Sequence, residues 1–280
     1  MRVVVLSPNH GERTRTSLLS LSPFKPSKHP RWELVRYVVF SSLLSETLRS
    51  RLGFVWWFLD PVLYMAVFYF VFAVIFERGG PDFVVKLLIA LVFWRWFDNT
   101  VKACAGSLVN GRGLMRQVYV SKFLFPLAAI LSQGIKSSVV FVVLILFLLV
   151  YGIEVDPAWL GLLPILLVEF LFISGVGVLL AAIIPFFPDL KTLIDYGIQM
   201  AFFLSGIFFE ISQLSPDVQA YFVLNPMAML IDQGRGVLLY QATPDWLLLG
   251  AIAFVSVLIG CLGTWLLSRY DRDYPALLLV

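Results

Sequence analysis

The chain has 280 residues, of which 60% are hydrophobic and 14% charged, with a formal net charge of +3. Soluble domains usually carry about 25% charged and about 45–50% apolar residues, so this composition excludes a soluble enzyme, a disordered chain and a fibrous repeat. It predicts an integral membrane protein, since each spanning helix needs about 20 apolar residues. Cys104 and Cys261 lie in apolar stretches, and His10 and His29 lie in a polar leader, so no metal site is expected.

The N-terminal part of the chain is polar. Residues 1–30 contain four prolines and lack the apolar core of a signal peptide, so we expect a cytoplasmic leader. Residues 31–52 place Trp32, Val35 and Val39 at helical spacing among charged residues. This pattern predicts an amphipathic helix along the cytoplasmic membrane surface. The alternative is a charged extension of the first span.

Hydrophobic stretches then predict an all-α integral membrane protein with six spans within residues 53–268 and a cytoplasmic tail at 269–280. The predicted spans cover residues 55–76, 83–105, 123–151, 158–184, 190–209 and 246–267.

The distribution of Lys and Arg predicts the orientation of the spans. With the N-terminus inside, fifteen basic residues lie in cytoplasmic segments, whereas the outer loops contain Arg78 and Arg235, with Lys86 near the border. The positive-inside rule therefore places both termini in the cytoplasm. Tryptophans at the expected ends of spans fit an interfacial belt: Trp159, Trp246 and Trp265.

The outer segment between the last two spans, residues 210–245, is long and apolar. Ser215-Pro216 and Asn225-Pro226 each have the pattern of an N-cap followed by a proline in the first helical turn. They predict short helices at 216–223 and 226–239, which can dip into the outer leaflet as re-entrant helices. An ordinary surface hairpin is the alternative.

The motifs that the chain lacks narrow its function. It contains no GxxxxGK[ST], GxSxG or HExxH motif, and no internal repeat of the kind that secondary transporters contain. We therefore expect a membrane-embedded pathway or scaffold whose energy source lies on another protein. A membrane-embedded enzyme would need a cluster of acid and base residues at one interface, which the sequence does not offer.

Five short segments within residues 31–268 occur in one consistent order. They are RSRLGFVWWFLDP at 49–61, VYVSKFLFPL at 118–127, DLK at 189–191, LSGIF at 204–208 and LNPM at 224–227. Together they resemble the permeases of type-2 ABC exporters for polysaccharides. The LNPM segment favours the O-antigen and teichoic-acid branch over capsule export.

The resemblance implies a permease rather than an enzyme, located in the bacterial inner membrane and acting in a pathway such as lipopolysaccharide biosynthesis. Its expected partners are a second copy of the chain, two ATP-binding cassette subunits, a polyprenyl-linked glycan and membrane lipid, with no nucleic acid. ATP and Mg would bind the partner ATPase, and no cofactor is expected in this chain. The alternative is a permease of the same architecture that exports small hydrophobic drugs or lipids.

A separate ATPase needs a docking element. The cytoplasmic segment 107–122 is basic, interrupted by glycines, and has an apolar pair between two arginines, so we expect it to couple to the ATPase. A basic loop that lies on anionic lipid is the alternative. The coupling residues are Arg112, Gly113, Leu114, Met115 and Arg116, and the residues expected to form an outer gate are Pro216, Asn225, Pro226 and Met227.

Polar residues at membrane depth indicate the pathway, since a charge at the centre of a span costs about 2.5–3.5 kcal/mol. Each of the second and fifth spans has one polar stripe at helical spacing, and aromatic residues on the second span suit stacking on sugars. A purely structural ion-pair set and ordinary aromatic core packing are the alternatives. The expected pathway residues are Trp94, Arg95, Trp96, Phe97, Asp98, Lys102, Asp195 and Gln199.

Two further charges lie near mid-membrane, Lys136 on the third span and Glu169 on the fourth. Their distances from the connecting loop predict depths that differ by only about 4–5 Å. We therefore expect an ion pair, which would relieve the desolvation cost of both charges. The alternative is that each lines a wet pathway by itself.

Overall fold

The computed structural model describes residues 30–49, 53–75, 83–117 and 119–277. The expected leader at 1–30 lies outside these described residues except for Pro30. The chain divides into two compact units, residues 1–34 and 35–280, and the second contains the helical bundle. Every element among the described residues is helical, which confirms the all-α prediction.

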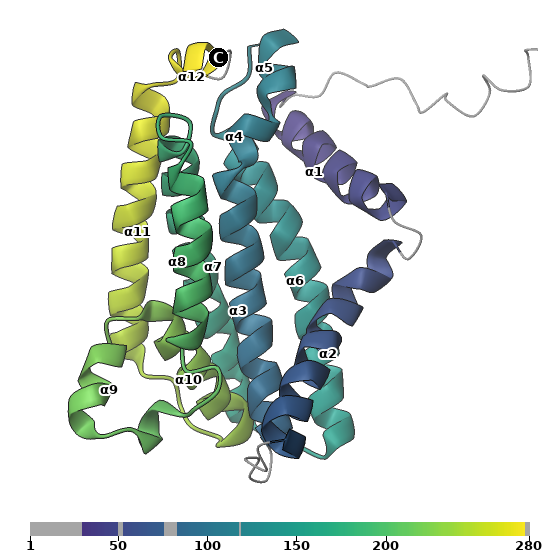
Figure 1. Cartoon of the computed structure of the whole chain (residues 1–280), viewed down its shortest axis with the longest axis vertical. Coiled ribbons are helices and arrows are strands. Elements are labelled where there is room, and N and C mark those ends of the chain that lie inside the picture. The colour runs from purple at the N-terminus through teal and green to yellow at the C-terminus, as the bar shows by residue number, and fades with distance from the viewer. Residues whose placement is uncertain (1–29, 50–52, 76–82, 118, 278–280) are drawn as a thin grey trace, which may run out of the picture. The chain divides into compact units, whose positions relative to one another are not determined.

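Within residues 35–280 the long helices α3, α6, α7, α8 and α11 run alongside one another (Figure 1). The short helices α9 and α10 lie at one end of this bundle, and α4, α5 and α12 lie at the other. The first half of the chain contains α1 (Pro30–Arg49), η2 (Gly53–Val55), α2 (Trp56–Tyr69), the π-helical η3 (Phe70–Ile75), α3 (Phe83–Ala105), α4 (Ser107–Asn110), α5 (Arg112–Gln117) and α6 (Leu124–Tyr151). The second half contains η4 (Pro157–Gly161), α7 (Leu162–Ile183), α8 (Leu190–Phe203), η5 (Ile211–Gln213), α9 (Pro216–Phe222), α10 (Pro226–Leu239), α11 (Trp246–Arg269) and α12 (Tyr274–Leu277).

Three helices of the described chain are long and apolar enough to cross a bilayer: Leu124–Tyr151, Pro157–Ile183 and Trp246–Arg269. α3 has a suitable length of 23 residues but carries four charged side chains. α8 has 14 residues, and at about 1.5 Å per residue it is shorter than a hydrocarbon core of about 30 Å. The expected span at 190–209 therefore ends earlier than predicted, at Phe203, where the chain turns through Gly206 in a left-handed conformation (φ 68°).

The helices α7 and α11 pack closely because glycines let their backbones approach. A Cβ atom at Gly175 would lie 2.6 Å from the Ser256 carbonyl oxygen, and one at Gly263 would lie 2.7 Å from the Leu179 backbone nitrogen. Small residues in such contacts let dispersion forces join spans that gain little from the hydrophobic effect in lipid. α3 packs against α6 and α7, and it contributes a continuous buried run from Leu87 to Trp94. These helices form the core of the bundle.

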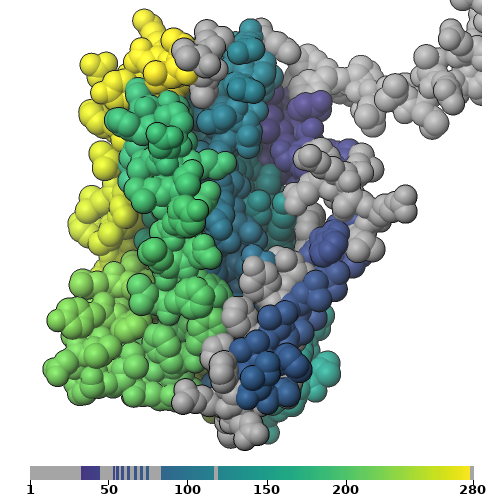
Figure 2. All heavy atoms as spheres, viewed as in Figure 1, coloured from purple at the N-terminus to yellow at the C-terminus, as the bar shows by residue number. Residues whose placement is uncertain are grey.

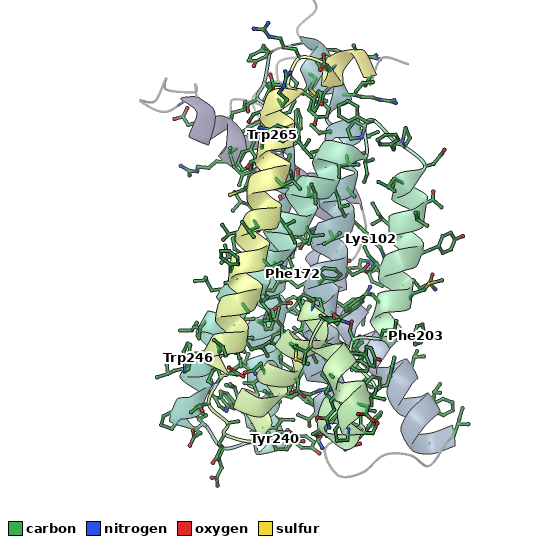
Figure 3. The ribbon with its side chains drawn as sticks, turned by 90° about the vertical axis from the view of Figure 1, so that its left-hand side faces the viewer. Lys102, Phe172, Phe203, Tyr240, Trp246 and Trp265 are labelled. Atoms are coloured by element: carbon green, nitrogen blue, oxygen red, sulfur yellow. The ribbon has the colours of Figure 1, made fainter. Side chains whose placement is uncertain are left out.

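Two exposed tryptophans mark the ends of α11. Trp246 and Trp265 are 64% and 59% exposed, and both side chains point away from the bundle (Figure 3). They are 19 residues apart, which corresponds to about 28 Å along a helix and matches the thickness of a hydrocarbon core. Trp159, the third expected belt residue, is half-buried against the core instead.

Candidate functional site

An open cavity of about 590 Å³ lies between α3 and α8. In Figure 2, α8 forms part of the face turned to the viewer, between α11 and α3. Four of the wall residues come from α3 and six from α8, and six of the ten are predicted pathway residues. The walls consist of Trp94, Arg95, Asp98, Lys102, Asp195, Tyr196, Ile198, Gln199, Phe202 and Phe203.

The charged residues of α3 form a chain of ion pairs along one side of this cavity. The Asp98 carboxylate lies 2.5 Å from Lys102 Nζ and 3.9 Å from Arg95 Nη1, one helical turn away on either side. Lys102 lies on the side of α3 that faces α8 (Figure 3). Asp195 on the opposite wall adds a second carboxylate, so the cavity holds two cations and two anions. The structural ion-pair set and the polar cavity wall are therefore the same residues.

Aromatic rings lie together at the end of the cavity nearest the C-terminal end of α8. Trp94 contacts Phe202 edge-on, with ring centroids 5.7 Å apart, and Phe202 in turn contacts Phe203 at 5.2 Å and Phe208 at 5.3 Å. The sequence analysis missed Tyr196, Ile198, Phe202 and Phe203. The polar stripe of the fifth span contained the signal, because Phe202 lies seven residues after Asp195 and so falls on the same helix face.

Two predicted pathway residues lie away from the cavity. Trp96 packs between Phe141 and Phe170, with centroid distances of 5.7 and 6.2 Å. Phe97 is 9% exposed and stacks on Phe172 at 5.8 Å. Both rings pack in the core, on the side of α3 that faces α6 and α7.

The predicted ion pair between Lys136 and Glu169 is wrong, since no salt bridge joins these two described side chains. Glu169 is fully buried, and neither carboxylate oxygen has a hydrogen-bond partner. The physical reason is helix rotation. α7 packs mainly against α11 and α3 and only slightly against α6, so its buried face does not turn toward Lys136.

The segment 210–245 contains the two short helices expected at 216–223 and 226–239, as α9 and α10. Asn225 caps α10, since its Oδ1 accepts hydrogen bonds from the backbone N–H groups of Met227 and Ala228 at 3.1 and 3.2 Å. Pro216 and Pro226 occupy the first turns of α9 and α10, and Met227 is buried. Ser215 is the N-cap residue of α9, as predicted, although its side chain makes no capping hydrogen bond. Asn225 Nδ2 also donates to the Leu204 carbonyl at 3.0 Å, which ties α10 to the end of α8.

Arg235 on α10 was counted among the loop charges but was not predicted as a structural residue. It is 3% exposed, and its guanidinium donates four hydrogen bonds to backbone carbonyls. The sequence offered only one signal, a lone arginine in an otherwise acidic outer segment. The four acceptors are Gly206 at 2.7 Å, Ile207 at 2.7 Å, Phe209 at 3.1 Å and Lys86 at 3.1 Å.

Glu210 adds an ionic contact beside the hydrogen bonds of Arg235. Its carboxylate lies 2.6 Å from Lys86 Nζ and accepts a hydrogen bond from the Tyr240 hydroxyl at 3.2 Å. Burial acts to raise the pKa of Glu210, but the hydrogen bond and charge of Lys86 outweigh it and hold this pKa below its ordinary value. Burial lowers the pKa of Arg235 to about 10, which still leaves the guanidinium charged at neutral pH. The N-terminal end of α3 and the turn after α8 are thus held together by hydrogen bonds and charge.

The predicted coupling segment forms two short helices, α4 and α5, at the end of the bundle opposite α9 and α10 (Figure 1). Arg112, Gly113 and Arg116 are exposed, and Leu114 and Met115 are half-buried. The helix α5 therefore presents two cations and a partly exposed apolar pair at this end of the bundle.

Comparison with known families decides the class of the protein. The family described as ABC-2 type transporter matches residues 35–239. The chain belongs to this family. It is therefore a multi-pass membrane protein and the permease component of an ABC transporter, a component that is not itself catalytic.

Similar proteins with assigned names agree with this assignment. The chain is 21% identical over 230 residues to an O-antigen export system permease protein RfbA of Klebsiella pneumoniae, covering 82% of this chain and 88% of the relative. It is 27% identical over 229 residues to the RfbA protein of Myxococcus xanthus, with 78% and 86% covered. The polysialic acid transport protein KpsM of Escherichia coli is 22% identical over 213 residues, with 72% and 81% covered.

Proposed function

We propose that this chain is the transmembrane subunit of an ATP-driven exporter that moves lipid-linked polysaccharide of the O-antigen type across the bacterial inner membrane. The α3–α8 cavity carries the proposal, because it combines charged, amide and aromatic side chains at the depth of the predicted spans. The names of the relatives support the same substrate class, since they include O-antigen and polysialic acid exporters.

The chemistry of the cavity suits a glycan better than a hydrophobic drug. Drug-sized ligands bind mostly apolar pockets with few polar groups, whereas this wall carries Arg95, Asp98, Lys102 and Asp195. Sugar hydroxyls can both donate to carboxylates and accept from cations. The faces of aromatic rings such as Phe202 offer contacts to sugar C–H groups that do not depend on sugar sequence.

The topology that we propose has six spans, with both termini in the cytoplasm. The spans are α2 with η3, then α3, α6, α7, α8 and α11, and the charge bias of the connecting segments sets their direction. α8 is short, and the turn at 204–209 extends its path toward the outer surface. The helices α9 and α10 follow on the outer side and gate the exit of the pathway through Pro216, Asn225, Pro226 and Met227.

The working assembly in this proposal contains two copies of the chain and two ATP-binding cassette subunits, which bind ATP and Mg. The segment 107–122 docks the ATPase through Arg112, Gly113, Leu114, Met115 and Arg116. The exposure of α8 is the argument for a second copy of the chain, since only Ile198 of its 14 residues is buried. A second copy would complete the wall of the open α3–α8 cavity.

Reconstitution of the assembled exporter tests the proposal. The chain and its ATPase are placed in vesicles, and ATP hydrolysis is measured with lipid-linked glycan, with a hydrophobic dye and with neither. We expect the glycan to stimulate hydrolysis and to appear on the far side of the membrane. Stimulation and transport of the dye alone would overturn the glycan assignment in favour of a drug exporter.

A further inference from the structure

The inner end of the bundle holds a polar network that joins the chain after α5 to the chain after α11. Residues 119–122 lead from α5 into α6, and residues 270–273 form the corner between α11 and α12. Asp271 links the two segments. Its Oδ2 accepts a hydrogen bond from the Tyr119 hydroxyl at 2.7 Å, and its Oδ1 accepts one from the Lys122 backbone N–H at 3.4 Å.

Lys122 makes this link electrostatic as well. It is only 2% exposed, its Nζ donates to the Val120 carbonyl at 3.1 Å, and it lies 4.0 Å from Asp271 Oδ2. The same Nζ lies 4.8 Å from the centre of the Tyr119 ring. A buried ammonium needs an anionic partner to offset its desolvation, and Asp271 supplies it. We call Tyr119, Lys122 and Asp271 the inner clasp.

The corner at 270–273 is fixed to α7 by a second set of contacts. Tyr274 is fully buried, and its hydroxyl donates to the Ala182 carbonyl in the last turn of α7 at 3.0 Å. The Phe186 ring meets Tyr270 and Tyr274 edge-on at 5.3 and 5.4 Å. Burial raises the pKa of Tyr274 to about 12, so the hydroxyl keeps its proton and remains a donor.

These contacts define a short mechanical route. α7 and α11 are joined by backbone contacts at Gly175 and Gly263, so they and the corner behave as one body. The segment 119–122 begins two residues after the end of α5. A displacement of α5 therefore reaches Tyr119 directly, and Asp271 carries it to α11.

We propose that Asp271, together with Tyr119 and Lys122, is a positioning group through which movement of the coupling helices α4 and α5 is passed to α7 and α11. This role rests on the proposed function, in which α4 and α5 dock the ATPase. The rival explanation is a staple that stabilises the inner end of the bundle and takes no part in transport.

The first test uses the purified full-length chain without its ATPase. Hydrogen–deuterium exchange is compared for wild type, Asp271→Ala, Tyr119→Phe and the control Asp273→Ala. Asp273 lies in the same corner, is exposed, and its side chain makes no hydrogen bond or ion pair with the described residues. We expect exchange at 119–123 to accelerate about tenfold in Asp271→Ala, as for loss of a hydrogen bond to a charged group. Unchanged exchange would overturn the clasp itself.

The second test uses the assembled exporter and measures substrate moved per ATP hydrolysed. We expect Asp271→Ala to assemble with the ATPase and to hydrolyse ATP close to the wild-type rate, while transport per ATP falls about tenfold, a typical coupling effect. Asp273→Ala should behave as wild type, and Asp271→Glu should recover part of the loss.

Two results would overturn the coupling role: an unchanged ratio of transport to hydrolysis in Asp271→Ala, or a loss of both in proportion. The ratio is measured with whichever substrate the wild-type complex moves. Failure of the wild-type complex to move glycan would therefore count against the proposed function and leave the test of the clasp intact.

Discussion

The helices α7 and α8 follow one another in the chain, yet they are built in opposite ways. α7 buries eleven of its 22 residues, whereas α8 buries only Ile198 among its 14. α7 approaches α11 closely at Gly175, while a Cβ atom at Gly197 of α8 would meet nothing within 4 Å. The comparison separates a scaffold, made of α3, α6, α7 and α11, from a wall helix that is held mainly at its C-terminal end.

The two helices also differ in what holds them. Close backbone packing fixes α7, and such packing tolerates almost no added volume. α8 is instead held by hydrogen bonds at its C-terminal end, where Arg235 and Asn225 donate to carbonyls of the turn that follows it. A helix anchored at one end and exposed along its length can move without unpacking the core, which suits the wall of a pathway.

The largest effect is expected when the C-terminal anchor of α8 is removed. Arg235→Met leaves four buried carbonyl acceptors without their donor, so we expect a loss of about 3–5 kcal/mol in the free energy of unfolding. Chemical or thermal unfolding of the purified chain measures it. Arg272→Met, at an exposed arginine, is the control and should stay near wild type. Equal stability of the two variants would show that the hydrogen bonds of Arg235 do not hold the end of α8.

The scaffold should be nearly as sensitive to a single methyl group. Gly263→Ala places its Cβ 2.7 Å from the Leu179 backbone nitrogen, so α7 and α11 must separate. We expect destabilisation of about 1–3 kcal/mol, the usual cost of overpacking. Gly250→Ala is a matched control on α11, because no atom lies within 4 Å of its Cβ position. If both variants unfolded alike, close packing could not be what fixes the scaffold.

The same substitution on α8 should have the opposite sign. Gly197→Ala meets no neighbour, and alanine favours a helix by up to about 1 kcal/mol over glycine. We expect equal or higher stability, measured by unfolding, together with unchanged assembly. Destabilisation as large as that of Gly263→Ala would place α8 in the packed core.

The smallest effect concerns pH. The pKa of Glu210 is lower in the folded chain than its ordinary value of 4.5, so ionised Glu210 stabilises the fold. This contribution is fully present above the ordinary value and is lost as the pH falls through the lowered pKa. Melting temperatures of wild type and Glu210→Gln should therefore converge as the medium is acidified through that window. A constant difference at all pH values would contradict the ionic role of Glu210.

Much of this organisation could be predicted from the sequence. Runs of apolar residues predicted the helices at 83–105 and 124–151, and the Asn225-Pro226 cap pattern predicted the helix at 226–239, each to within a residue or two. Helical spacing placed Arg95, Asp98 and Lys102 on one face, and the structure joins that face to Asp195 and Gln199 across one cavity. Periodicity along a single helix was enough for these predictions.

The predictions that failed depend on tertiary contacts. The pairing of Lys136 with Glu169 needed the rotation of α7, which its packing on α11 and α3 decides. α8 ends early, at Phe203, because the chain turns there. The carbonyls of this turn accept hydrogen bonds from Arg235, which lies about thirty positions later in the chain. Composition and spacing carry no record of such long-range hydrogen bonds.

The most direct test of the central claim, that glycan passes along the α3–α8 cavity, is crosslinking during transport. A photoreactive phenylalanine analogue is placed at Gln199, which lines the cavity, or at Leu193, which is 66% exposed on the same helix but does not line it. The exporter, assembled with its ATPase, is irradiated while lipid-linked glycan and ATP are supplied. We predict a glycan adduct at position 199 that requires ATP, and little adduct at 193. Equal adducts at both positions, or an adduct at 193 alone, would contradict the account.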